Sequence, residues 1–295
     1  MNSSIQSLWM LVACFLFAVM SVGIKLVSDF YSVGEILMAR GVAGAAVTLL
    51  YVACNGGTLK TTLVRPHLWR SVIGSFAVWL WVASFSLLPI ATAVTLNYTS
   101  SVWLALILFI AAWWRGQEKL EWGFGLTILL SFVGVTLLLR PSMGESEMIG
   151  GILALSSGLV SALAYLQVRQ LGKSGEPEYR IVFYFSLTCF VAGLAGNALH
   201  SGDLVPFRAT QGWREVTWLV MIGTSAALAQ LALTRAYHLG NAFLSANLQY
   251  MGIVFSAFLG VVIWADKLDG LAWCGIAVIL IGGVLATYYN QRGNR

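Results

Sequence analysis

Apolar segments of about twenty residues, the length of a helix that crosses roughly 30 Å of hydrocarbon, recur along the whole of this sequence. The segments are continuously apolar and do not alternate with polar residues, which excludes an outer-membrane barrel. Only 10% of the 295 residues are charged, whereas soluble domains have roughly 25%. In lipid, a chain satisfies its backbone hydrogen bonds only in helices or closed barrels. The sequence therefore predicts an all-α integral membrane protein.

The apolar segments predict ten transmembrane helices, over residues 6–27, 33–54, 70–88, 90–112, 121–139, 148–170, 180–199, 214–236, 241–264 and 268–289. The prolines fall only between these ranges, where a missing N–H has no cost: Pro66, Pro89, Pro141, Pro177 and Pro206. Since no proline interrupts a predicted helix, the sequence contains no indication of a helix broken within the membrane.

A short segment in the helix predicted over 90–112 is repeated in the second half of the chain. LNYTSSVW at 96–103 corresponds to LQYMGIVF at 248–255, and an acid–Lys–Leu triplet follows each segment at a similar interval. The sequence therefore predicts two homologous halves of five helices each, residues 1–140 and 148–290. Because five is an odd number, the halves enter the membrane from opposite sides and form an inverted repeat.

Positive residues indicate the orientation of the chain. If the N-terminus is cytoplasmic, eleven of the seventeen Lys and Arg residues lie in cytoplasmic connections or the C-terminal tail, as the positive-inside rule requires. Ten helices then put both termini in the cytoplasm. The net charge of +5 reflects this bias, and no basic run with interleaved aromatics predicts nucleic-acid binding. No metal site is expected, because the four cysteines lack metal-ligand or disulfide spacing: Cys14, Cys54, Cys189 and Cys274.

The two halves and the paired segments at 96–103 and 248–255 resemble the EamA-type permeases of the drug/metabolite transporter superfamily, over essentially the whole chain. The resemblance implies a multi-pass permease of the bacterial inner membrane, usually a metabolite exporter. It also implies a central cavity between the first, third, fourth, sixth, eighth and ninth helices, with the fifth and tenth at the periphery. Many such permeases have a proline where this chain has Ser101, and an arginine near the position of Arg40.

Polar side chains within the predicted helices identify candidate substrate-binding residues, because they are costly in lipid unless they face a cavity or a partner. The amide–tyrosine pairs of the repeat are Asn97 with Tyr98 and Gln249 with Tyr250. The further candidates are Arg40, Trp79, Tyr165, Gln230 and Ser245. For the amides, hydrogen bonds that hold helices together are the alternative role.

Two cations within the predicted helices have open interpretations. Lys25 either extends to the membrane interface or contacts substrate. Arg40 lies deeper, and it either pairs with Glu35 or helix-end carbonyls or binds a substrate carboxylate or phosphate.

All twelve acidic residues lie in or near the predicted connections, so no central carboxylate is present for a proton relay. We therefore expect facilitated export or exchange of a small metabolite by alternating access. An amino acid, an aromatic compound or a nucleoside-like molecule would suit the polar and aromatic candidates. Uptake of a vitamin or adenosyl metabolite, and proton-coupled antiport of a drug or metabolite, are alternatives on the same fold.

Two functions other than transport are also considered, a membrane enzyme and a scaffold protein that transports nothing. No HExxH, GxSxG or Asp-rich motif supports an enzyme, and no cofactor is expected. The polar residues on many predicted helices argue against a scaffold. A monomer and a homodimer formed through the glycines of the fifth and tenth helices both remain open.

Overall fold

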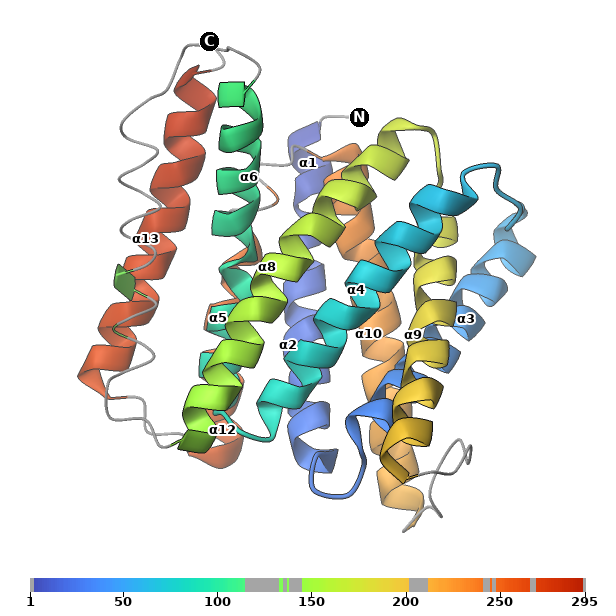
Figure 1. The fold of residues 1–295 in the computed structure, drawn as a ribbon, viewed down its shortest axis with the longest axis horizontal. Helices are drawn as coiled ribbons and strands as arrows, with labels where there is room; N and C mark the ends of the chain where they lie inside the picture. Colours follow the sequence, from blue (N-terminus) through green and yellow to red (C-terminus); the bar gives the residue numbers. More distant parts are fainter. Residues whose placement is uncertain are drawn as a thin grey trace.

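The computed structural model of the chain describes residues 3–114, 133–134, 137, 145–201, 212–240, 245, 248–265 and 269–293. The regular structure of these residues is helical throughout, and the helices form one bundle (Figure 1). The helices are α1 (Ser3–Ser7), α2 (Trp9–Val27), α3 (Val33–Asn55), α4 (Val64–Phe85), α5 (Ile90–Tyr98), α6 (Ser100–Trp114), α8 (Glu145–Lys173), α9 (Glu178–Ser201), α10 (Trp213–Leu239), α12 (Met251–Trp264) and α13 (Gly270–Gly293).

Six helical segments are long and apolar enough to cross a membrane: Ile5–Val27, Val33–Asn55, Val64–Phe85, Ser146–Lys173, Glu178–Leu199 and Val216–Leu239. α12 and the Trp273–Gly282 part of α13 are shorter apolar helices. Large apolar side chains such as Leu50, Phe76 and Phe258 are exposed on the outside of the bundle, where lipid would cover them. The prediction of a multi-pass helical membrane protein is confirmed. The helix predicted over 121–139 lies outside the described residues, apart from three positions.

α4 begins earlier than the sequence indicated, at Val64 instead of residue 70. Pro66 therefore lies in the first turn of α4, and the prediction that it belongs to a connection is wrong. A proline is tolerated there because the first N–H groups of a helix have no intrahelical acceptor. As a consequence, Arg70 lies about two turns inside α4 and not at its end.

The helix predicted over 90–112 is divided at Thr99 into α5 and α6, although no proline is present. The Thr99 hydroxyl and the Thr99 N–H both donate to Leu96 O, at 2.6 and 3.2 Å. This side-chain bond competes with the helical pattern and tightens the turn. A similar turn precedes α12 at Tyr250. The first interruption directly follows an amide–tyrosine pair and the second falls on the tyrosine of the other pair, so the expectation of unbroken helices is wrong at these two places.

The helices pack in a small number of extended pairs. α3 runs along α9, α2 along α10 and α4 along α8, while α5 meets α12 near the centre. Close approach of α3 and α9 depends on glycine, because a Cβ atom on Gly193 would meet the carbonyl oxygen of Gly34 and the side chain of Met38. The N-terminus of α3 is fixed by a capping box, in which Ser32 and Glu35 exchange hydrogen bonds.

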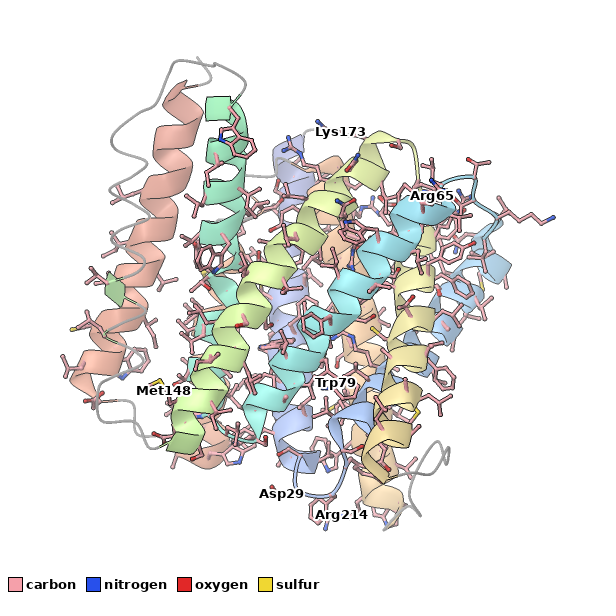
Figure 2. The ribbon with its side chains drawn as sticks, in the orientation of Figure 1. Asp29, Arg65, Trp79, Met148, Lys173 and Arg214 are labelled. Atoms are coloured by element: carbon pink, nitrogen blue, oxygen red, sulfur yellow. The ribbon has the colours of Figure 1, made fainter. Side chains whose placement is uncertain are left out.

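The two ends of the bundle carry different side chains. Arg65 and Lys173 lie at one end, which also holds α1 and the C-terminal end of α13 (Figures 1 and 2). Asp29 and Arg214 lie at the opposite end (Figure 2). The beginning of the described chain and the C-terminal end of its last helix therefore lie at the same end of the bundle.

Candidate functional site

A small cavity of about 40 Å³ lies at the centre of the bundle. Its lining comes from seven helices: Phe17, Arg40, Arg70, Gly74, Ala77, Val78, Trp81, Asn97, Tyr98, Ser161, Ala164, Tyr165, Phe185 and Gln230. A space of this size holds about three water molecules, at roughly 10–15 Å³ each. The helices must therefore separate before a larger molecule can enter.

Arg40 reaches the cavity from α3 and is 5% exposed. Its Nη2 donates to Gln230 Oε1 at 3.3 Å, and its Nη1 lies 3.4 Å from the sulfur of Met20. Glu35 is not its partner, because the Glu35 carboxylate accepts the backbone N–H of Ser32 at 2.8 Å. The guanidinium carbon lies 5.5 Å from the centre of the Phe185 ring. Arg40 thus keeps its charge without a carboxylate beside it.

Arg70 enters the same cavity from α4 and is 2% exposed. Its guanidinium carbon lies 4.4 Å from the centre of the Phe185 ring, and its Nε and Nη1 have no hydrogen-bond partner. Gly74, one turn further along α4, makes room for it, since a Cβ atom there would collide with Arg70 Nη1. The sequence predicts Arg70 at the first residue of the helix over 70–88, among the cytoplasmic positive charges. Because proline is tolerated in the first turn of a helix, Pro66 is compatible with a helix that begins near Val64 and continues through Arg70.

Asn97 and Tyr98, the first amide–tyrosine pair, both line the cavity. Asn97 Nδ2 donates to Ser157 Oγ of α8 at 2.6 Å, so that Asn97 Oδ1 remains an acceptor. The ring of Tyr98 lies against Gly252 of α12, where any side chain would overlap it. α8 also comes close to the turn at Thr99, because a Cβ atom on Gly158 would meet the Thr99 hydroxyl.

Gln249, from the second pair, lies one layer behind the cavity wall. Its Oε1 accepts hydrogen bonds from Tyr237 at 2.9 Å and Ser101 at 3.4 Å, and its Nε2 donates to the Tyr165 hydroxyl at 3.3 Å. The rings of Tyr165 and Tyr237 are stacked, with centroids 5.2 Å apart. Tyr250 is buried beside Ser101, to which it is hydrogen-bonded. The two amides of the repeat therefore have different surroundings.

The structure brings together some of the predicted substrate-binding residues and separates others. Arg40, Asn97, Tyr98, Tyr165 and Gln230 line the cavity, whereas Trp79, Ser245, Gln249 and Tyr250 do not. The Ser245 hydroxyl donates to Ala236 O at 2.9 Å. Trp79 packs against α9, where a Cβ atom on Gly196 would collide with its ring. Trp81, two positions further along α4, lines the cavity instead.

Polar contacts close the bundle on either side of the cavity. At the Arg65 end, Glu176 lies 3.2 Å from His67 and 2.8 Å from Arg180, and it accepts a 2.6 Å hydrogen bond from Thr61. At the Asp29 end, the Ser32 hydroxyl donates to Asn197 Oδ1 at 2.7 Å.

Lys25 also lies at the Asp29 end, where it stabilises the end of α4. Its Nζ donates to the carbonyl oxygens of Phe85 and Leu88, at 2.6 and 3.2 Å. The sequence leaves two alternatives for Lys25, extension to the membrane interface and substrate contact. The hydrogen bonds to Phe85 and Leu88 are neither of these. A cation at the C-terminus of a helix satisfies carbonyl groups that have no intrahelical donor.

Residues 148–288 match the model of the EamA-like transporter family. The chain is an EamA-type transporter. This EamA-type transporter is 27% identical over 281 residues to the pseudopaline exporter CntI of Pseudomonas aeruginosa, and the alignment covers 95% of each chain. It is 24% identical over 264 residues to the S-adenosylmethionine uptake transporter of Rickettsia bellii, across 88% of this chain and 84% of that one.

A solved crystal structure with 18% identity superimposes on this EamA-type transporter with a TM-score of 0.71, over 98% of this chain and 100% of the other. This similarity shows that the fold is shared. The named relatives are transporters and not enzymes, in agreement with the absence of enzyme motifs in the sequence. The chain is accordingly a multi-pass membrane transporter.

Proposed function

We propose that this transporter exports or exchanges a small metabolite across the bacterial inner membrane by alternating access, without ion coupling. The observation that carries the proposal is the central cavity, which is lined by guanidinium, amide, hydroxyl and aromatic groups. Among the residues that the structure describes, none of those that line the cavity is a carboxylate or a histidine that would carry a proton through the membrane. An amino acid or another small zwitterionic or anionic compound with a planar part suits such a lining.

The proposed architecture is ten transmembrane helices in two inverted repeats, residues 1–140 and 148–290. The packing of the described helices supports it. If α2, α3, α4 and α6 correspond to α8, α9, α10 and α12, the pair α2–α10 exchanges with α8–α4, and the pair α2–α12 exchanges with α8–α6. The pair α3–α9 is related to itself. A two-fold axis in the membrane plane produces this pattern of contacts.

In the proposed cycle, the contacts at the two ends of the bundle open in turn. Opening at the Arg65 end requires Glu176 to separate from His67 and Thr61, because these residues join the α8–α9 connection to the region around the start of α4. Opening at the opposite end requires Ser32 to separate from Asn197. Movement of one half against the other would expose the cavity alternately to each side.

The second candidate function is uptake of an adenosyl metabolite or a vitamin. The similarity to the S-adenosylmethionine uptake transporter favours this alternative. Proton-coupled antiport is a third candidate, which the composition of the cavity lining disfavours. The direction of net flux follows the substrate gradient in a facilitated transporter.

Counterflow in proteoliposomes tests the proposal. Vesicles with the purified full-length protein are preloaded with mixed amino acids, nucleosides and vitamins, and each labelled compound is added outside, with and without a pH gradient. Saturable counterflow that ignores the pH gradient would support facilitated exchange. A requirement for the gradient would overturn the absence of ion coupling, and no counterflow of any compound would overturn the transport function. The Ser245→Ala variant, outside the cavity, is the matched control for Asn97→Ala.

A further inference from the structure

We propose that Arg40 and Arg70 together bind the carboxylate of the transported molecule, so that this transporter selects small organic anions with a planar apolar body. The inference rests on the transport function proposed above and adds a substrate class to it. Arg70 was not among the residues expected to bind substrate, and its position inside α4 brings the second guanidinium to the cavity.

The first argument is the charge of the site. The guanidinium carbons of Arg40 and Arg70 lie 5.5 and 4.4 Å from the centre of the same ring, that of Phe185. The described titratable groups that interact with the charge of Arg70 are Cys189, Tyr165, Arg40 and His67, and none of these four is a carboxylate. Arginine remains protonated in proteins, so burial does not remove the repulsion. Within the part of the chain that the structure describes, no carboxylate balances these two buried charges, so an anion that enters the cavity would stabilise them.

The second argument is the number of donors that lack an acceptor. Nε and Nη1 of Arg70 and Nε1 of Trp81 are buried without a hydrogen-bond partner, and both residues line the cavity. The Arg40 guanidinium has only the Gln230 amide oxygen and a methionine sulfur as acceptors. A buried donor without a partner costs free energy, which an incoming carboxylate would recover. A guanidinium offers parallel N–H groups that match the two oxygens of a carboxylate.

The third argument concerns the rest of the molecule that carries this carboxylate. Phe17, Trp81 and Phe185 border the cavity, and the rings of Phe17 and Trp81 meet edge to face at 6.2 Å. Flat apolar groups pack well between such rings. On another side, Asn97 Oδ1 can accept a hydrogen bond from an ammonium or hydroxyl group. The site therefore fits an aromatic or apolar carboxylate and tolerates an amino group beside the carboxylate.

A carboxylate is a better match than a phosphate for this space. The cavity has a volume of about 40 Å³, and Gly74 and Ala77 are among its lining residues. A planar carboxylate needs less space than a tetrahedral phosphate dianion. Probes that share one apolar body test whether the site binds a carboxylate or a phosphate more tightly. They also test whether binding depends on the charge of the probe or on its shape.

The experiment compares four probes with the same phenyl body: phenylacetate, phenyl phosphate, phenethylamine and 2-phenylethanol. Binding to the detergent-purified full-length protein is measured by calorimetry, and each probe is then tested as a competitor in the counterflow assay. We expect phenylacetate to bind and compete, and the amine and the alcohol to do neither. Preference for phenyl phosphate over phenylacetate would overturn the assignment to carboxylates, and equal binding of the amine would overturn the anion site.

Variants connect this selectivity to the two arginines. We expect Arg70→Gln to weaken phenylacetate binding by roughly tenfold or more, the usual effect of removing a hydrogen bond to a charged group. Arg70→Lys keeps the charge but loses the planar fork, so an intermediate loss is expected. Gly74→Ala leaves Arg70 in the sequence and displaces its guanidinium. Arg235→Gln is the matched control, because Arg235 lies against Trp9 and Gln6, away from the cavity lining.

The outcomes separate the anion site from transport itself. Phenylacetate binding that depends on Arg70, without counterflow of any compound, would support the site and overturn the transport function. Counterflow of neutral or cationic metabolites that is unchanged in Arg70→Gln would support transport and overturn the site. If Arg70→Gln does not fold, Arg70→Lys and Gly74→Ala decide: unchanged phenylacetate affinity in both overturns the inference.

Discussion

The hydroxyl of Thr61 donates a 2.6 Å hydrogen bond to Glu176 Oε1 and thereby joins the α3–α4 connection to the α8–α9 connection. The other oxygen of Glu176 lies 2.8 Å from Arg180 Nη1 and 3.2 Å from His67 Nε2. Arg180 also donates to the carbonyl oxygen of Thr58, at 2.8 and 3.0 Å. One carboxylate thus organises the closed end of the bundle, and its removal has consequences for stability.

The first prediction concerns acid pH. Burial raises the pKa of Glu176, but the hydrogen bonds from Thr61, Arg180 and His67 outweigh it, and the pKa lies below the ordinary value of 4.5. The stabilisation by Glu176 is therefore present above the ordinary carboxyl pKa and is lost as pH falls through the lowered one. We expect the melting temperature of the wild type to fall more steeply with decreasing pH than that of Glu176→Gln. Glu147→Gln, an exposed carboxylate on α8, should follow the wild type.

The second prediction concerns Lys25, whose ammonium satisfies the carbonyl oxygens of Phe85 and Leu88. Lys25→Met should lower the free energy of unfolding by about 1–3 kcal/mol, because it leaves these acceptors without their cation. Thermal unfolding in detergent measures the loss, with exposed Lys60→Met as the control. A variant with wild-type stability and lost counterflow would instead assign Lys25 to substrate contact.

The third prediction tests the close approach of α12 and α5. A methyl group at Gly252 would overlap the ring of Tyr98. Overpacking of this kind costs about 1–3 kcal/mol, so we expect Gly252→Ala to lower the melting temperature. Gly270→Ala is the matched control, since a Cβ atom at the start of α13 meets nothing within 4 Å. Equal stability of the two variants would contradict the packing described here.

The fourth prediction separates the two amides of the repeat. Asn97 lines the cavity, so Asn97→Ala should raise the half-saturating substrate concentration in counterflow. Gln249 lies behind the wall and satisfies Tyr165 and Tyr237, so Gln249→Ala should mainly lower the free energy of unfolding, by about 1–3 kcal/mol. The opposite pattern, with affinity lost only in Gln249→Ala, would mean that the cavity opens toward α12.

Much of the fold could be predicted from the sequence, because the apolar segments and the amide–tyrosine pairs are local patterns. The start of α4 was placed too late, since the prediction treated Pro66 and the charged residues after it as a connection. That one boundary removed Arg70 from the candidate site. The turn at Thr99 was also missed, because a threonine hydroxyl that bonds to a backbone carbonyl has no distinctive sequence signal.

Side-chain direction accounts for the remaining differences. Trp79 and Trp81 are two positions apart on α4, and at 3.6 residues per turn they point about 200° apart. The sequence alone does not show which of them faces the cavity. Gln249 and Asn97 are equivalent in the repeat but not in their surroundings, because Gln249 is surrounded by Ser101, Tyr165 and Tyr237. Matching positions in the two sequence segments therefore do not have the same side-chain contacts.

The placement of Arg40 and Arg70 around Phe185 also affects the kinetics of a transport cycle. Both cations come from the first half of the chain, whereas the Phe185 ring that both of them contact comes from the second. In the proposed transport cycle, an anion bound there would screen their repulsion and join the two halves, so a loaded carrier would reorient at a lower electrostatic cost than an empty one. We therefore expect exchange to outpace net efflux. Comparing efflux into buffer with and without external substrate measures the difference, and equal rates would mean that the return of the empty carrier is not the slow step.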